Sequence, residues 1–330
     1  MTAAPWIAAQ RQALARQPGH ALLLQGPSGL GQYALALELA QAWLCESPSD
    51  QGACGQCPSC HGIAVRTHAD LCVLMPETEM LARGWPLSEK AQQEIDEKKR
   101  KPSREIRVDA LRDAVEFAQR TSGRGQGKVV LVYPAERMNA VTANALLKTL
   151  EEPVGDLRFV LATEAAHQLL PTIRSRCLTH TMAWPQAPQA LEWLQANGLP
   201  GTEAIVLLRA AGGRPEDALR LAAAGITAQR WTALPRALAR GDASALADWP
   251  PAQAVDALQK TCHDLLSVVA GGTPRFFAAA DLPAAVSPGP LAAWWRELAD
   301  TLRTAEHPFN PGLMLEALVS RARAALNSAR

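Results

Sequence analysis

The chain has 330 residues, of which 48% are hydrophobic and 20% charged, so it can fold into two or three domains that each bury a core. Its formal net charge is only +1, which disfavours tight electrostatic binding to nucleic acid by this chain alone. The N-terminus lacks a signal-peptide pattern and no apolar run reaches the length of a membrane span, so we expect a cytoplasmic protein with no membrane partner.

The first chemical motif is a glycine loop between a predicted strand, residues 21–24, and a predicted helix that begins near residue 34. The loop contains Gly26, Gly29 and Gly31. Glycines allow positive φ angles and the helix N-terminus offers free N–H groups, which together form a cradle for phosphate. However, Gln32 replaces the lysine of the G-x-x-x-x-G-K-[ST] pattern, and Tyr33 replaces its Mg²⁺-binding hydroxyl residue. We interpret the motif as a degenerate nucleotide loop and expect no bound ATP; a chance glycine-rich turn is the alternative.

Four cysteines follow the loop's helix, namely Cys45, Cys54, Cys57 and Cys60. The last three have C-x₂-C-x₂-C spacing, and four thiolates can close a tetrahedral Zn²⁺ site. We predict structural zinc, since sulfur would fill every ligand position. An iron–sulfur cluster stays open as an alternative, and a disulfide pair is disfavoured in the cytosol. His61 and His68 are expected at the surface rather than as ligands.

The chain then alternates between predicted strands and helices. The strands are predicted at residues 69–76, 127–136 and 157–163, and the helices from 106 onward, capped by Asp109, and over 139–153. This alternation predicts a parallel, doubly wound sheet. The charged segment 77–104 is expected to be a solvated helical insertion, with phosphate contact by its Lys98–Lys101 run as the alternative. From about Trp184 only helical patterns follow, and we expect the later tryptophans to be core or interface anchors.

The strand at 127–136 provides a second sign of lost ATPase chemistry. In an active ATPase this strand ends in an acidic pair that holds Mg²⁺ and polarises the attacking water. The matching positions here are Tyr133 and Pro134. Two independent catalytic elements are therefore missing from one chain.

Three features together are highly specific: the four-cysteine segment, the Leu-Leu-Lys-Thr-Leu-Glu-Glu-Pro block at 146–153, and the Ser-Arg-Cys sequence at 175–177. They resemble the delta-prime family of bacterial DNA polymerase III clamp loaders, three-domain members of the AAA+ class. This resemblance implies an AAA+ parallel-sheet domain over 1–184, with a zinc module at 45–60. It further implies a small helical lid domain over 185–225 and an all-helical collar domain over 226–330.

The resemblance also implies a function within an assembly. Such loaders place a sliding clamp on primed DNA, using ATP bound between subunits of a hetero-pentameric ring that includes motor gamma or tau subunits and a delta subunit. Arg176 would be the arginine finger that reaches the γ-phosphate held by a neighbouring motor subunit; an ordinary surface salt bridge is the alternative. Lys148 and Glu151 would lie near the inter-subunit face, or form a simple i,i+3 surface pair. Glu216 stands where motor subunits have a nucleotide-sensing arginine, whereas Thr163 matches their other sensor.

We therefore predict a non-hydrolysing stator subunit that donates Arg176, and no catalytic activity of its own outside the polymerase holoenzyme. An active ATPase with a variant loop is the main alternative, and it requires an acidic Mg²⁺ ligand near Tyr133. A zinc-dependent DNA-binding protein is a third hypothesis, but it would require basic residues beside the cysteines, and none is present there.

Overall fold

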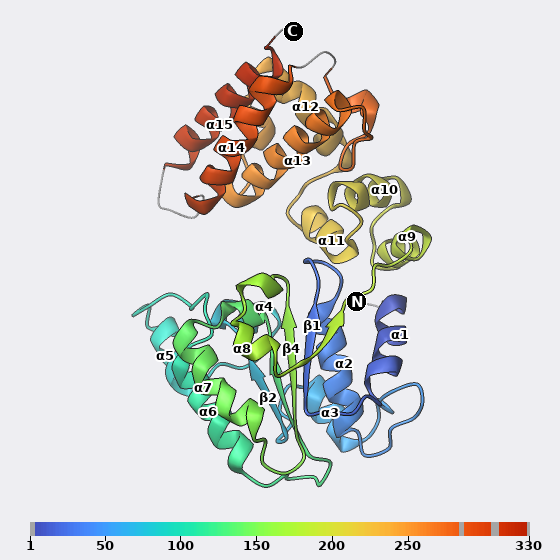
Figure 1. Cartoon of the computed structure of the whole chain (residues 1–330), viewed down its shortest axis with the longest axis vertical. Helices are drawn as coiled ribbons and strands as arrows, with labels where there is room; N and C mark the ends of the chain where they lie inside the picture. Colours follow the sequence, from blue (N-terminus) through green and yellow to red (C-terminus); the bar gives the residue numbers. More distant parts are fainter. Residues whose placement is uncertain (1–3, 284–286, 305–309, 329–330) are drawn as a thin grey trace. The chain divides into compact units, whose positions relative to one another are not determined.

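The computed structural model describes residues 4–283, 287–304 and 310–328. The described chain divides into two compact units, one before and one after the boundary between Trp184 and Pro185. Figure 1 colours the two units along the sequence, from blue and green to yellow and red. Within the described residues, no helix combines the length and apolar character needed to cross a lipid bilayer.

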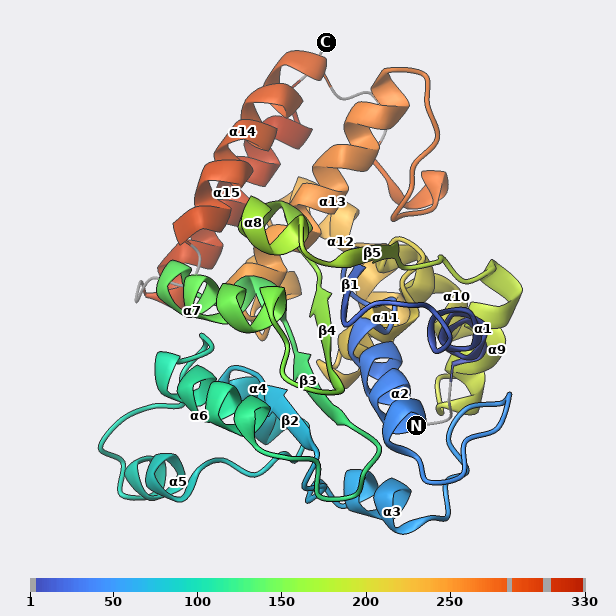
Figure 2. The same ribbon diagram turned by 60° about the horizontal axis from the view of Figure 1, so that its bottom comes forward.

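The first unit is built on a five-stranded parallel sheet. Its strands are β1 (Ala21–Gln25), β2 (Leu71–Leu74), β3 (Lys128–Val132), β4 (Leu157–Thr163) and β5 (Leu178–Thr181). They lie in the order β2-β3-β4-β1-β5, so β4 is the central strand and β1 pairs with β4 on one side and with the edge strand β5 on the other (Figure 2). This confirms the predicted parallel sheet. The sequence did not reveal β5, because its side chains are mostly exposed and lack an apolar alternation.

Helices cover both faces of this sheet. The helices of this unit are α1 (Pro5–Leu14), α2 (Gln32–Leu44), α3 (Pro58–Ala64), α4 (Glu77–Ala82), α5 (Glu89–Asp96), α6 (Val108–Gln119), α7 (Ala140–Glu151) and α8 (Pro171–Arg174). Helices α6 and α7 lie on one face and α2 on the other (Figure 2). Phe159, Leu146 and Val130 are almost completely buried on the α6–α7 face. Parallel strands covered on both sides must be apolar throughout, which explains the runs that marked β1 and β3 in the sequence.

Two local predictions in this unit were wrong. The segment 77–104 was predicted to be helical, and it contains α4 and α5, but its basic run at 98–101 is not helical, since α5 ends at Asp96 and Lys98 has a φ angle of +56°. Asp109 was expected to cap α6, but it lies in the first helical turn and pairs with Arg112 instead. Asn139, in contrast, caps α7, since its side chain accepts a hydrogen bond from the Thr142 N–H.

The described part of the second unit is entirely helical. It contains α9 (Ala187–Ala196), α10 (Gly201–Ala210), α11 (Pro215–Ala223), α12 (Ala228–Arg240), α13 (Pro251–Val269), α14 (Pro288–Thr304) and α15 (Pro311–Leu326). Trp231 stacks on Trp249 and on Phe277, and all three are buried. The boundary between a lid (185–225) and a collar (226–330) stays a prediction.

Candidate functional site

The glycine loop joins β1 to α2 in the shape expected of a phosphate cradle. Gly29 and Gly31 have φ angles of +79° and +91°, a backbone conformation that side chains other than glycine rarely adopt. The Gln32 amide nitrogen donates to the carbonyl oxygens of Gly26 and Pro27, at 2.9 and 2.7 Å, and the side chain is buried. The residue at the lysine position is therefore tied to the loop's own backbone and carries no charge.

Aromatic side chains stand at the two motif positions, Tyr33 and Tyr133, that we compared with the Mg²⁺-binding residues of an active ATPase. The Tyr33 and Tyr133 rings lie 5.5 Å apart, and the Arg83 guanidinium lies over both, 4.3 and 4.9 Å from their centroids. Trp85 donates from its indole nitrogen to the Tyr33 hydroxyl at 2.7 Å. Arg83 and Trp85 both come from the charged insertion at 77–104. No sequence pattern predicted that this segment would contact the helix that follows the glycine loop.

Two carboxylates that the sequence analysis did not consider lie beside this cluster. Glu136, in the 3-10 turn Ala135–Arg137, accepts hydrogen bonds from the Thr163 hydroxyl at 2.7 Å and from the Glu164 N–H at 3.1 Å. Glu164 accepts a hydrogen bond from the Tyr133 hydroxyl at 2.9 Å. Burial, reinforced by the charge of Glu164, raises the pKa of Tyr133 well above its usual range. Tyr133 is therefore a neutral donor at physiological pH.

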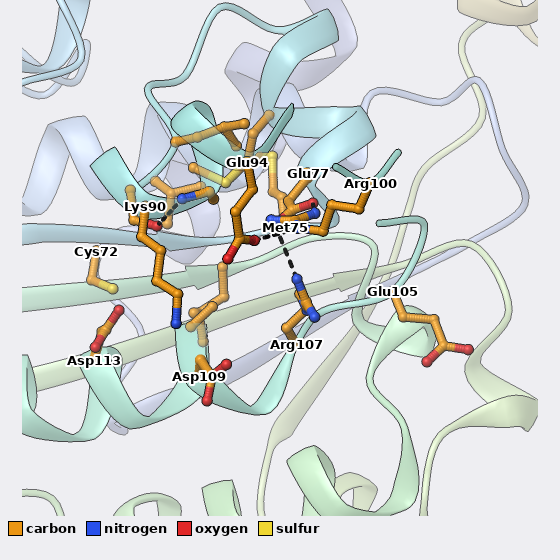
Figure 3. Close-up of a pocket in the computed structure, with 17 residues that line it drawn as sticks. Cys72, Met75, Glu77, Lys90, Glu94, Arg100, Glu105, Arg107, Asp109 and Asp113 are labelled. Carbon is orange, nitrogen blue, oxygen red and sulfur yellow. Dashed lines mark hydrogen bonds and ion pairs between the residues drawn. The ribbon is translucent and has the colours of Figure 1, made fainter. Parts of the chain in front are cut away.

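Arg100 anchors the insertion to the end of β2. Its guanidinium contacts both oxygens of Glu77, the first residue of α4, and also contacts Glu94 on α5 at 2.7 Å (Figure 3). The Ser103 N–H also donates to Glu77 at 2.7 Å. The sequence had suggested that the basic run 98–101 lies on a solvated face. Arg100 instead forms ion pairs with two carboxylates of the insertion. Beneath α5 lies a cavity of about 500 Å³, floored by residues such as Cys72 and Leu74.

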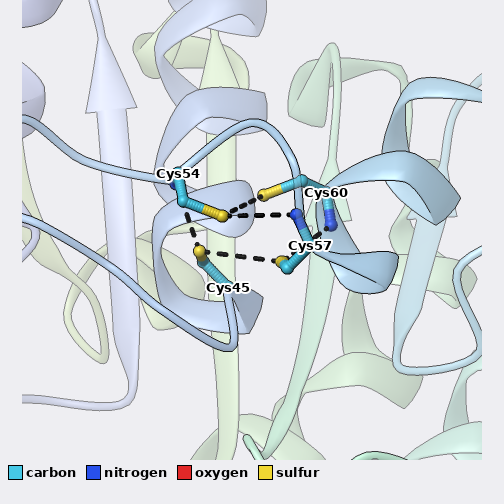
Figure 4. A group of neighbouring side chains, drawn as sticks. All are labelled: Cys45, Cys54, Cys57 and Cys60. Atoms are coloured by element: carbon cyan, nitrogen blue, oxygen red, sulfur yellow. Dashed lines mark hydrogen bonds between the residues drawn. The ribbon is translucent and has the colours of Figure 1, made fainter.

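The four predicted metal ligands lie together in the structure. The Sγ atoms of Cys45, Cys54, Cys57 and Cys60 are all within 4.8 Å of one another (Figure 4). Cys45 and Cys57 are 3.9 Å apart, and Cys54 and Cys60 4.0 Å. Tetrahedral zinc with Zn–S bonds of about 2.3 Å requires sulfurs about 3.8 Å apart, so this cluster fits a Zn²⁺ ion.

Backbone N–H groups point at these sulfurs and favour thiolates. The N–H of Cys54 donates to Cys45, that of Cys57 to Cys54, and that of Cys60 to Cys57. Burial opposes ionisation of Cys57, but the N–H groups of Cys60 and Glu46 outweigh it and lower the pKa of that thiol to about 6. Burial instead raises the pKa of Cys45 and that of Cys60, so these two thiols would release protons when a metal, which binds thiolates, enters the cluster.

The two histidines near the cluster differ in their exposure. His61 is exposed, as expected. His68 is buried, contrary to prediction, because its Nδ1 accepts a hydrogen bond from the Asp70 N–H. Asp70 also holds the 122–124 turn, where Arg124 pairs with Glu46 of the cysteine segment. His68 therefore belongs to the packing around the cysteine segment.

Arg176 lies on an exposed turn between α8 and β5. Its guanidinium pairs with Glu151, the last residue of α7, and its Nη1 donates to the Thr172 carbonyl oxygen at 2.9 Å. Lys148 makes no ion pair among the described residues, so the simple i,i+3 pair with Glu151 is not formed. The structure thus joins two motifs that are far apart in the sequence, the 146–153 block and the Ser-Arg-Cys turn.

Comparison with known proteins places the chain in a family. Residues 4–185 match the family model described as DNA polymerase III, delta subunit. A Pseudomonas aeruginosa protein named DNA polymerase III subunit delta′ is 42% identical over 217 residues, which cover 65% of this chain and 59% of that protein. Its Escherichia coli namesake is 35% identical over 203 residues, covering 61% and 54%. The chain thus spans somewhat more than half the length of these relatives.

A solved structure agrees with the fold. The DNA polymerase III gamma subunit-related protein of Thermotoga maritima superimposes with a TM-score of 0.50 at 17% identity, covering 97% of this chain and 99% of that one. This likeness concerns the fold, which is AAA+-like: a five-stranded parallel sheet followed by a helical region. Together with the match over residues 4–185, it means that the chain belongs to the DNA polymerase III delta subunit family.

Proposed function

We propose that this chain is a non-hydrolysing subunit of a DNA polymerase III clamp loader, which helps to place a sliding clamp on primed DNA during chromosome replication. Its partners would be motor gamma or tau subunits and a delta subunit in a hetero-pentameric ring. Polymerase activity would belong to the holoenzyme as a whole. The observation that carries this proposal is the cluster of Arg83, Tyr33 and Tyr133 beside the glycine loop, in the place where an active ATPase would bind Mg²⁺.

That position already contains a cation and two aromatic rings. In an active site Mg²⁺ bridges the β- and γ-phosphates and a lysine reaches them. Here the Arg83 guanidinium lies over Tyr33 and Tyr133, and Gln32 is bonded to its own loop. A metal ion would have to displace a charged group that is held by two rings and by the Glu79 carboxylate at 3.1 Å. This arrangement supports a chain that does not bind Mg²⁺·ATP.

An active ATPase remains the competing function, because Glu136 and Glu164 lie close to the end of β3. Each is engaged: Glu136 by Thr163 and the Glu164 N–H, and Glu164 by the Tyr133 hydroxyl. Each carboxylate is thus turned toward these donors, and Mg²⁺ would have to compete with them for the carboxylate oxygens. We therefore favour the non-hydrolysing subunit.

Equilibrium binding of Mg²⁺·ATP to the isolated chain tests this part of the proposal. Calorimetry up to millimolar nucleotide should detect no binding. Micromolar binding would contradict the proposal and favour the ATPase. A nucleotide-binding gamma or tau subunit, titrated under the same conditions, is the positive control.

The second part of the proposal assigns Arg176 as an arginine finger for a neighbouring motor subunit. A guanidinium near the transferred phosphoryl group neutralises charge in the transition state, and such fingers contribute on the order of 10³–10⁵ in rate. Arg176 lies on an exposed turn, with 34% of its side chain accessible, so a neighbouring subunit can reach it. Arg176→Ala should leave folding intact and slow ATP hydrolysis by the reconstituted loader; unchanged hydrolysis would remove the assignment.

A further inference from the structure

We infer that Glu151 is a positioning residue for Arg176, holding the guanidinium so that its outer edge faces a phosphate on the neighbouring subunit. This inference rests on the proposed function of Arg176. It goes beyond that function because it assigns a role to the last residue of α7, which the sequence left as one half of a surface pair.

The backbone at Arg176 is firmly anchored on both sides. The Ser175 N–H donates to the Pro171 carbonyl at 2.9 Å, and the Arg176 N–H donates to Ile173 at 3.1 Å. Ile173 is completely buried, and Cys177 packs against the same core. The position from which the arginine side chain starts is therefore fixed by the fold, but its long side chain still has many rotamers.

Three contacts fix that side chain. One carboxylate oxygen of Glu151 contacts both Nε and Nη2 of Arg176, and Nη1 donates to the Thr172 carbonyl oxygen at 2.9 Å. The Ser175 hydroxyl lies 3.4 Å from Nη1. Glu151 of α7 thus contacts the edge of the guanidinium formed by Nε and Nη2, whereas Thr172 of α8 and Ser175 contact Nη1.

The edge that is left matters for function. A guanidinium has five N–H donors in a planar fork, and an oxygen shared by Nε and Nη2 occupies the side of that fork. At the end of the fork the second N–H of Nη2 remains for a phosphate oxygen, and the Nη1 N–H that contacts the Ser175 hydroxyl at 3.4 Å is the one most easily exchanged for a second phosphate oxygen. Glu151 therefore does not compete with the phosphate for the same edge. It orients the group that binds it, and orientation before reaction lowers the barrier.

Glu151 has a suitable location for this role. It is the C-terminal residue of α7, a helix whose Leu146 and Leu150 are buried in the core, so its backbone does not move freely. The next residue, Glu152, is exposed and makes no ion pair among the described residues. This neighbour therefore offers a matched control, with the same charge and nearly the same place.

The test uses the clamp loader reconstituted from this chain and its partner subunits, with ATP hydrolysis measured in the presence of clamp and primed DNA. We expect Glu151→Ala to lower kcat about 5- to 20-fold, with KM for ATP unchanged, because the finger loses its preferred orientation. Glu151→Gln keeps an oxygen that accepts hydrogen bonds but lacks the charge, so its loss should be smaller. Glu152→Ala should hydrolyse ATP at the normal rate.

The double variant Glu151→Ala/Arg176→Ala separates positioning from a general structural effect. If Glu151 acts only through Arg176, the double variant should hydrolyse no more slowly than Arg176→Ala alone. Additive losses would overturn the inference, as would normal hydrolysis by Glu151→Ala beside an impaired Arg176→Ala. Normal hydrolysis by Arg176→Ala would overturn the finger assignment itself, and this inference with it. If Glu151→Ala does not assemble, the isosteric Glu151→Gln variant decides.

Discussion

The Arg83 guanidinium lies over the rings of Tyr33 and Tyr133, and this contact changes what a single substitution at the glycine loop can achieve. Cation–π contacts contribute from about 0.5 to 2 kcal/mol each, more when water is excluded. Tyr133 is buried, and the buried Trp85 donates a hydrogen bond to the Tyr33 hydroxyl, which holds the second ring in place. The missing lysine is therefore one of several obstacles to nucleotide binding.

At the residue scale, Gln32→Lys should not restore binding of Mg²⁺·ATP. The new ammonium could reach phosphate, but the metal position would still contain Arg83 and two tyrosines. Calorimetry should give no dissociation constant below about 1 mM, equivalent to less than about 4 kcal/mol of binding free energy. An unchanged thermal midpoint would establish that the variant folds. Tight binding by this single variant would mean that Arg83 moves aside easily.

At the element scale, the 77–104 insertion is held together by Glu77, which binds Arg100 and the Ser103 N–H near its other end. Burial raises the pKa of this carboxyl, but hydrogen bonds from Arg100 and from the Ser103 N–H outweigh it, so the pKa lies below its usual 4.5. A carboxyl whose pKa is lower in the folded protein stabilises it above the ordinary pKa, and this stabilisation is lost as the pH falls through the folded value.

We therefore expect Glu77→Gln to lower the free energy of unfolding by about 1–3 kcal/mol at pH 7, because it leaves Arg100 without its closest carboxylate. The difference from the wild type should shrink when the pH is lowered from 7 to a value below the folded pKa of Glu77, which lies under the usual 4.5, because Glu77 itself is then protonated. Urea denaturation at both pH values measures this. Glu105→Gln, an exposed carboxylate lining the same cavity, is the matched control and should have little effect at either pH. A constant difference across this range would contradict the ionic role of Glu77.

The cysteine segment is a second element whose stability can be tested alone. We predict about one equivalent of zinc per chain purified without chelator, since four sulfurs fill a tetrahedral site. Cys57→Ser should retain less than about half an equivalent, because one ligand is weakened. Cys72→Ala, which removes a thiol outside the cluster, should retain the full amount. Elemental analysis distinguishes these outcomes, and iron in place of zinc would favour the iron–sulfur alternative.

Amino-acid patterns predicted the features of this molecule that depend on residues close together in the sequence. Apolar runs located β1, β3 and β4, and the C-x₂-C spacing located the four cysteines that cluster in the structure. The contacts beside the glycine loop join Tyr33 to Arg83 and Trp85, and a separate ion pair joins Arg176 to Glu151; both bring together residues that are far apart in the sequence. No periodicity encodes such contacts. Strand β5 was missed for a different reason, because an edge strand with polar, exposed side chains looks like a loop.

At the scale of the whole molecule, the described helices after residue 226, which we predicted to form a collar, expose several apolar side chains. On α14, Trp295 is 38% exposed and Leu302 45% exposed, and they lie two helical turns apart on one face. Val268, near the end of α13, is 43% exposed. A cavity of about 350 Å³ lies beside Trp295 and is lined also by Leu266 and His263. Such a surface is typical of a protein–protein interface.

If this surface joins the collar of neighbouring subunits, Trp295→Glu should prevent the chain from entering the loader while leaving its own fold intact. A buried carboxylate without a partner costs several kcal/mol at an interface, whereas on an exposed monomer surface it costs little. Ile205→Glu is the matched control, because Ile205 is 52% exposed on α10, outside the collar region, and receives the same charge. Size-exclusion chromatography of the reconstituted mixture should place the Ile205 variant in the complex and the Trp295 variant in the monomer fractions, with equal thermal midpoints for both chains. Assembly of the Trp295 variant at normal yield would mean that the collar contact uses another face of α13 to α15, and the exposed tryptophan would then need a different partner.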